Sequence, residues 1–290
     1  MSFQKRISTG EFAVLAEMNP PKGVDISKMV LDSRRIKGRV DAVVVPDMDN
    51  GVMTMSALGS AVLMQQQGLE AIIHVYCRDR NRMALQGDLL AAHVLGIQNL
   101  IVVRSEDMAN GDHREAKTVF DISELEFLEA IASLQSGRDM AGFELNGKPE
   151  LFAGCTITLC ADAKQQQVEL DLVKRKIDAG ARFVVTPPVF DVEALGGFLE
   201  SAGNLGVPVI ATVFLLKSVA IARYIANSEP EAHISEAIIR RIRKSPDREM
   251  EGIKIAAETV SALKKTVQGV KIQTVGWEHR LPVILDMAGI

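Results

Sequence analysis

Short runs of apolar, often β-branched residues recur along the chain, and an amphipathic stretch follows almost every one of them. Eight such runs predict strands, at Phe12–Met18, Ala42–Pro46, Ile72–Cys77, Leu100–Arg104, Phe152–Thr158, Phe183–Thr186, Pro208–Val213 and about Val270–Val275. Most are continuous Val, Ile and Leu runs, which are typical of parallel strands covered on both faces. The pattern therefore predicts an α/β protein with a parallel sheet.

Helices are expected between these strands. The clearest lie at Ser56–Gln67, Ser123–Leu134, Val168–Ala179 and Val192–Ser201, and another carries apolar positions at Met83, Leu85, Leu89, Leu90, His93 and Val94. Ser123 suits a helix N-cap, and Gly180 and Gly203 stand where helix C-caps belong. The segment Ser218–Lys265 is almost entirely helical in pattern, so more than one helix is expected before the last strand.

Eight strand–helix repeats in one chain of this length predict a (β/α)8 TIM barrel that occupies residues 1–290 as a single domain. A doubly wound open sheet is the alternative. No G-x-G-x-x-G follows a predicted strand and no G-x-x-x-x-G-K-[ST] occurs, so the two best-known phosphate-loop signatures are missing. No linker, low-complexity segment or repeat divides the sequence.

Charge argues against a nucleic-acid partner. The formal net charge is −4, and the densest basic run is KRK at Lys174–Lys176, inside a predicted helix. A solvated helix face is the simpler interpretation of that run. Phosphate backbones require Lys and Arg clustered over one face, which this sequence does not offer.

Three further patterns bear on location and metals. The first residues lack an apolar signal region, and no uncharged apolar stretch approaches the roughly 18 residues of a membrane span. The three cysteines, Cys77, Cys155 and Cys160, form no C-x-x-C pair, so reduced thiols in a cytoplasmic protein are expected. His and Cys are not grouped at ligand spacing, so no metal is expected.

In a barrel, polar groups at the carboxyl ends of strands are the first site candidates. Glu17 ends the first strand, in AVLAEMNPP. A carboxylate buried among Leu15, Ala16 and Met18 should resist ionisation and would suit a general acid. The alternative is a carboxylate paired with a basic residue of the core.

Other polar residues stand at or near the ends of later strands. They are Asp47, Asp49 and Asn50 after strand two, His74 within strand three, Arg78, Asp79, Arg80 and Asn81 after it, Arg104, Glu106 and Asp107 after strand four, and Thr186 at the end of strand six. The first three suit turns as well as ligands. A lone histidine within a strand, such as His74, is more often a core residue whose hydrogen bonds are satisfied than a ligand. The four residues after strand three could bind a phosphate, or they could pair with one another while capping the next helix.

Two loops stand out. The polar segment that runs from strand four to Asp121 is long, and long loops in compact barrels are often functional. Pro187 and Pro188 follow Thr186, and they remove two backbone donors from that strand end.

Several segments, in one order, resemble the methylenetetrahydrofolate reductase family. They are AEMNPPKG, HVYCRDRNRMALQGDLLAAHVLGIQNL, GDHREAKTVFDISEL, KRKIDAGARFVVTPPVFD, EGIKIAAETVSALKK and LPVILDMAGI. The resemblance is closest to the branch whose third strand ends in CRDRNR. It implies a (β/α)8 barrel that binds FAD without a Rossmann domain and reduces 5,10-methylenetetrahydrofolate to 5-methyltetrahydrofolate.

The resemblance also implies residue roles. Glu17 matches the acid that protonates the folate and opens its imidazolidine ring. His74, Arg104, Glu169 and Lys176 match cofactor-binding positions, and a pyrophosphate suits charge-assisted bonds from Arg and Lys. Glu106 matches an acidic residue near flavin and folate, so the resemblance implies a catalytic and substrate-binding role for it, and Pro187 stands where the family binds substrate.

Four strand ends depart from the family pattern. Ser105-Glu106 replaces Gly-Asp, Pro46 replaces Thr, and Thr156–Ala161 lacks a proline-containing, flavin-lining pattern. Thr186-Pro187 replaces Thr-Gln, which removes an amide that binds the pterin. These departures leave open a divergent member with an altered substrate, or an accessory folate- or flavin-binding subunit with little activity of its own. Expected partners are a folate-type substrate, a reduced donor such as NAD(P)H or a redox subunit, and further copies or subunits of a complex.

Overall fold

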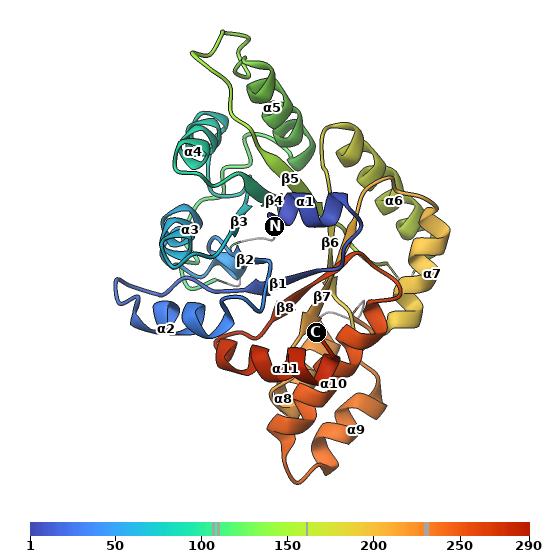
Figure 1. Ribbon diagram of the computed structural model, residues 1–290. Helices are drawn as coiled ribbons and strands as arrows, with labels where there is room; N and C mark the ends of the chain where they lie inside the picture. The colour runs from blue at the N-terminus through green and yellow to red at the C-terminus, as the bar shows by residue number, and fades with distance from the viewer. Residues whose placement is uncertain (106–107, 109–110, 161, 229–231) are drawn as a thin grey trace.

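Parallel strands form a closed barrel. A computed structural model describes residues 1–105, 108, 111–160, 162–228 and 232–290. Within them, eight strands pair in sequence order, and the last pairs with the first (Figure 1). The strands are β1 (Ala13–Glu17), β2 (Ala42–Val45), β3 (Ala71–Val75), β4 (Asn99–Val102), β5 (Phe152–Thr156), β6 (Val184–Pro188), β7 (Val209–Phe214) and β8 (Gly269–Gln273). The predicted (β/α)8 barrel is confirmed, and the open-sheet alternative is wrong.

Helices lie around this barrel, apart from the first of them, which lies across one end of it (Figure 1). They are α1 (Phe3–Ser8), α2 (Ser27–Ile36), α3 (Ala57–Gln66), α4 (Arg82–Val94), α5 (Glu124–Ser136), α6 (Ala163–Asp178), α7 (Val192–Ala202), α8 (Val219–Ser228), α9 (Glu236–Lys244), α10 (Arg248–Leu263) and α11 (Leu281–Ala288). Ser123 caps α5 through a complete capping box, as its sequence position predicts. The helical segment before the last strand contains α8, α9 and α10, so the prediction of more than one helix is confirmed.

Two helix faces differ from expectation. Leu85 and Leu89 of α4 are buried, but Met83 and Val94 are 77% and 82% exposed. Met83 and Val94, the first and last of the predicted apolar positions, therefore do not belong to the buried face of this helix. In α6, Lys174 and Arg175 are exposed as predicted for a solvated face, but Lys176 is only 1% exposed.

An apolar layer closes the amino-terminal end of the barrel. Helix α1 lies across that end (Figure 1), and its Phe3 and Ile7 are buried. The Phe3 ring meets the Phe183 ring edge-on at 5.3 Å, and Phe152 stacks on Phe183 at 5.5 Å. A Cβ atom on Gly154 would lie 2.4 Å from the Phe183 ring, so only glycine fits there. We name Phe3, Phe152 and Phe183 the aromatic floor.

Polar residues replace apolar ones toward the opposite end of the barrel. On β1 and β8, Leu15 lies beside Lys271 and Glu17 beside Gln273. Side chains alternate along a strand, so Glu17 shares the interior side of β1 with Leu15, and Lys271 and Gln273 share one side of β8. This register brings three polar side chains together above an apolar interior.

Candidate active site

Glu17 is held by two residues of β8. Its Oε2 accepts a hydrogen bond from Lys271 Nζ at 2.8 Å, and Gln273 Nε2 lies 2.9 and 2.8 Å from the two carboxylate oxygens. Both members of the ion pair are buried, with Glu17 5% and Lys271 6% exposed. The alternative reading from sequence, a carboxylate paired with a core basic residue, is therefore the one that the geometry supports. The argument from an isolated, apolar-buried carboxyl does not hold.

A second cluster joins β2 to β3. Asp49 begins the short helix η1 (Asp49–Gly51), and its Oδ1 accepts a hydrogen bond from the Tyr76 hydroxyl and lies 3.4 Å from His74 Nδ1. The flanking residues Met48 and Asn50 have φ of 56° and 55°, so the backbone bends sharply around Asp49. This turn places the Asp49 carboxylate beside His74 and Tyr76 at the end of the third strand. Asp49 therefore both belongs to the turn and contacts side chains of the site.

Electrostatics fix the protonation of two members of this cluster. Burial alone would raise the pKa of Asp49, but the hydrogen bond of His74 and its charge when protonated, the Tyr76 hydroxyl and the charge of Lys271 together lower it below its usual value. Burial, and then the neighbouring Asp49 carboxylate, raise the pKa of Tyr76 well above its usual value. Near neutral pH, Asp49 is therefore a carboxylate and Tyr76 a phenol.

The basic residues after β3 are occupied by carboxylates. Arg78 Nε contacts Asp79 at 2.7 Å, its Nη2 donates to the Met48 carbonyl at 2.9 Å, and its guanidinium lies 5.0 Å from the centre of the Tyr76 ring. Asn81 caps α4 by accepting from Ala84 N at 3.0 Å. Of the two readings from sequence, pairing at a helix cap describes this segment, and no phosphate is needed to neutralise Arg78.

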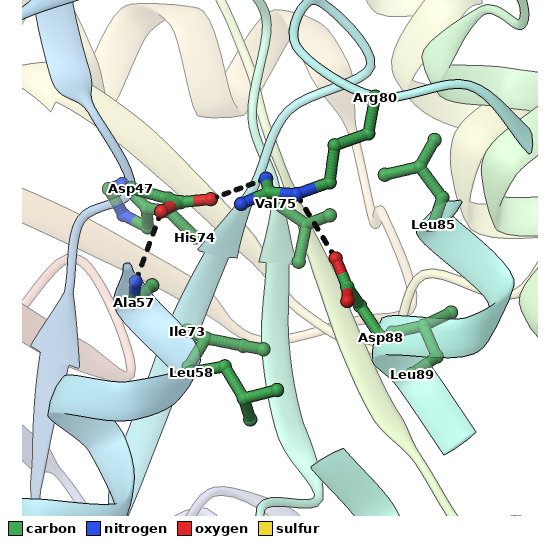
Figure 2. A pocket seen from close by; sticks show the side chains of 10 residues that line it. All are labelled: Asp47, Ala57, Leu58, Ile73, His74, Val75, Arg80, Leu85, Asp88 and Leu89. Atoms are coloured by element: carbon green, nitrogen blue, oxygen red, sulfur yellow. Dashed lines mark hydrogen bonds and ion pairs between the residues drawn. The ribbon is translucent and has the colours of Figure 1, made fainter. Parts of the chain in front are cut away.

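Arg80 has partners outside its own segment. It contacts Asp47 at 2.6 Å and Asp88 of α4 at 3.1 Å, above a small pocket against Leu85 and Leu89 (Figure 2). Asp47 Oδ1 also accepts a hydrogen bond from the backbone N of Ala57, the first residue of α3. The arrangement joins β2 to α3 and α4, so Arg80 and Asp47 stabilise the scaffold beside the site.

The cofactor-binding residues that the resemblance implies lie in two environments. The Arg104 side chain is 54% exposed, and its Nη1 contacts Thr158 Oγ1 and Glu169 Oε2, both at 3.0 Å. Glu169 also accepts from the backbone N of Thr158 at 3.0 Å, so it fixes Arg104 and the end of β5 together. Lys176 is fully buried, and its Nζ contacts the Glu124 carboxylate and the Thr156 carbonyl.

The end of β6 is irregular where the two prolines lie. The pairing register with β7 shifts between Val185 and Pro188. Thr186 compensates, because its Oγ1 accepts from Thr212 N at 3.1 Å and its carbonyl accepts from Thr212 Oγ1 at 2.6 Å. Pro187 adds no hydrogen-bonding side chain to this strand end. Glu106 and Asp107 lie outside the described residues.

Lys271 and Gln273 were not among the residues singled out from the sequence. The signal is the alternation in GVKIQ, where two polar residues two positions apart share one face of an apolar strand. Tyr76 was also missed, although it follows His74 at the same spacing. Sequence reasoning thus identified Glu17, Asp49 and His74 but not Lys271, Gln273 and Tyr76, which contact them.

None of the described helices combines the length and apolar character that crossing a membrane requires. Nor do the described His, Cys, Asp and Glu side chains form a group of three or more that could hold a metal ion.

Comparison with known proteins adds to this geometry. A curated relative, the membrane protein insertase YidC of Rickettsia bellii (strain OSU 85-389), is 24% identical over 121 residues, which are 42% of this chain and 20% of that protein. The match covers about a fifth of that relative's length, and so short and weak a match shows no family. Among solved structures, EDTA monooxygenase (EmoA) from Chelativorans sp. BNC1 has a TM-score of 0.57 and 10% identity, over 96% of this chain and 94% of that one. That likeness shows the shared fold alone.

The family comparison covers almost the whole sequence. The family described as methylenetetrahydrofolate reductase matches residues 2–289, which include both clusters at the carboxyl ends of the strands. This agrees with the resemblance seen in the sequence segments. The chain belongs to the methylenetetrahydrofolate reductase family.

Proposed function

We propose that this chain is an oxidoreductase that reduces 5,10-methylenetetrahydrofolate to 5-methyltetrahydrofolate with a flavin as hydride carrier. The family match supports the reaction class. The observation that carries the proposal is Glu17, a buried carboxylate at the carboxyl end of β1 that Lys271 and Gln273 hold in place. Carboxyl groups fixed at this end of a barrel are suited to acid–base chemistry.

A flavin fits two of the implied residues. His74 Nε2 is buried and has no hydrogen-bond partner among the described residues, so a polar group of a ligand would satisfy it. The contacts of Arg104 with Thr158 and Glu169 both use Nη1, and the side chain is half exposed, so it can approach a phosphate. We propose FAD as the flavin, held by these two residues. When bound, the flavin supplies hydride transfer.

The protein's own residues supply the proton. In the proposed reaction, Glu17 takes up a proton from solvent before the folate binds and then gives it to a ring nitrogen of the folate, and the bond from that nitrogen to the methylene carbon breaks. The electron pair of that bond stays on the nitrogen, and the methylene carbon is left as an iminium that accepts a hydride. Lys271 Nζ and Gln273 Nε2 are in position to stabilise the carboxylate that remains on Glu17.

A second candidate function rests on charge compensation. Lys271, Lys176 and Arg78 each contact a carboxylate, on Glu17, Glu124 and Asp79 respectively. Paired cations attract an anionic cofactor or substrate less strongly than free ones. Together with Pro187, this supports the alternative of an accessory folate- or flavin-binding member with little activity of its own, or one with an altered substrate.

Titration of the purified chain with FAD tests the proposal. We expect binding, and we expect Arg104→Ala to weaken it by about ten- to a hundredfold, the usual effect of losing a charge-assisted bond to phosphate. Arg138→Ala is the matched control, since Arg138 is another exposed arginine that pairs with a glutamate. Lys176→Ala is expected to lower stability rather than affinity, because Lys176 is buried against Glu124.

Two outcomes would redirect the interpretation. Unchanged FAD affinity in Arg104→Ala would show that Arg104 does not hold the cofactor. Failure of the parent protein to bind FAD would contradict the flavin-dependent reductase and favour the accessory function.

Pro187→Gln is expected to improve folate binding. The side-chain amide can pair with donors and acceptors of a buried pterin, each worth about 1–3 kcal/mol when it would otherwise be unpaired. The measurement is the concentration dependence of flavin reoxidation by methylenetetrahydrofolate after photoreduction. Pro188→Gln adds the same side chain one position later and serves as control. Equal folate affinity in parent and Pro187→Gln would show that this departure is neutral.

A further inference from the structure

The contacts of Asp49 determine more than its own position. His74 and Tyr76 lie two residues apart at the end of β3, so their side chains can reach the same carboxylate. Asp49 Oδ1 accepts a hydrogen bond from the Tyr76 hydroxyl and lies 3.4 Å from His74 Nδ1. The two rings lie edge to face with centroids 6.2 Å apart. The carboxylate therefore contacts one specific nitrogen of the imidazole.

Chemistry dictates which way the hydrogen bond runs. A carboxylate has only acceptor sites, so His74 Nδ1 makes a favourable contact with Asp49 only when it carries the hydrogen. A neutral imidazole has one N–H, and its other nitrogen is then an acceptor. The pKa of Asp49 is lowered, although burial opposes this, so the carboxylate persists near neutral pH.

In the neutral imidazole, the acceptor nitrogen is the unsatisfied one. His74 is 5% exposed, and within the described part of the chain its Nε2 has no hydrogen-bond partner. Charged groups around the cluster include Lys271, which acts on Asp49, and Glu17 and Arg78, which act on Tyr76. A buried acceptor without a donor is destabilising unless a ligand supplies one.

We propose that Asp49 is a positioning residue that fixes His74 as the Nδ1–H tautomer, so that Nε2 accepts a hydrogen bond from a ligand N–H or O–H. Flavin and pterin rings both carry such an N–H edge. The identity of the ligand rests on the proposed function, but the tautomer does not, because it follows from contacts within the chain.

Long-range proton–nitrogen NMR of the full-length chain, labelled with ¹⁵N at histidine and without ligand, tests the tautomer at about pH 8, where an ordinary histidine is neutral. The His74→Gln variant assigns the His74 signals among the five histidines. We expect a protonated Nδ1 and a bare Nε2 in the parent protein. In Asp49→Ala we expect the hydrogen to move largely to Nε2.

Asp47→Ala is the matched control, because Asp47 comes from the same loop but bonds Arg80 and Ala57. It should leave the His74 tautomer unchanged. If Asp49→Ala does not fold, Tyr76→Phe leaves the carboxylate in place and should retain the Nδ1–H tautomer. A bare Nδ1 in the parent protein, or an unchanged tautomer in folded Asp49→Ala, would overturn the proposal.

FAD titration of the same variants separates this inference from the proposed function. We expect Asp49→Ala to weaken FAD binding by about tenfold, the value of one hydrogen bond. The Nδ1–H tautomer together with no FAD binding by the parent protein would support the role of Asp49 and contradict the flavin. FAD binding together with the Nε2–H tautomer in the parent would do the reverse.

Discussion

Replacing Lys271 with methionine is expected to lower the free energy of unfolding by about 3–5 kcal/mol, the usual effect of removing one partner of a buried ion pair. The side chains of Lys271 and Glu17 are only 7% and 5% exposed, so the remaining carboxylate would be buried with Gln273 as its remaining hydrogen-bond donor. Urea unfolding monitored by circular dichroism measures the change.

A double variant separates lost packing from the unpaired charge. Glu17→Gln combined with Lys271→Met removes both charges, and exchanging a buried ion pair for neutral groups is often close to neutral in stability. We therefore expect the double variant to regain most of the lost stability. Lys176→Met is the matched control, with a smaller expected loss because its partner Glu124 is 19% exposed. A Lys271→Met protein as stable as the parent would show that the pair contributes nothing.

The largest effect on activity is expected from Glu17→Gln. If Glu17 is the proton donor of the proposed reaction, its amide replacement should slow reoxidation of reduced flavin by methylenetetrahydrofolate by about 10²–10⁴-fold, the range for general acid catalysis. Single-turnover stopped-flow absorbance isolates this step from reduction of the flavin by its donor.

Glu70→Gln is a suitable control for that experiment. Glu70 also holds neighbouring groups, the backbone N of Phe3 and the Asn99 amide, but it precedes β3 at the opposite end of the barrel. Its replacement should leave the reoxidation rate near that of the parent. An undiminished rate in Glu17→Gln would eliminate Glu17 as the acid while leaving the family membership intact.

The barrel itself could be predicted because its signal is local. The strand Ala42–Val45 is a continuous apolar run and Asn99–Val102 is apolar after its first residue, a composition typical of covered parallel strands. Ser123 was predictable as an N-cap for the same reason, since its partner Glu126 lies in the next turn. The positions of Glu17 and His74 followed from where their strands end.

The contacts within the site were not predictable in this way. Glu17 and Lys271 are 254 residues apart, and they meet only because β8 closes against β1 in one register. Asp49 reaches His74 through a turn with two left-handed non-glycine residues, a conformation that the sequence does not announce. Lys176 looked like part of a solvated run because burial of its ammonium depends on Glu124, which belongs to another helix.

The aromatic floor has a consequence for how protons move during turnover. Phe3, Phe152 and Phe183 are buried and fill the amino-terminal end of the barrel, so the polar layer above them communicates with solvent from the carboxyl end. In the proposed reaction the folate would enter from that same end. A bound folate would then block the access of solvent to Glu17, so the proton used in each cycle must reach Glu17 before the folate binds. Glu17 would then be protonated again only after the product has left, so each binding event would allow a single proton transfer.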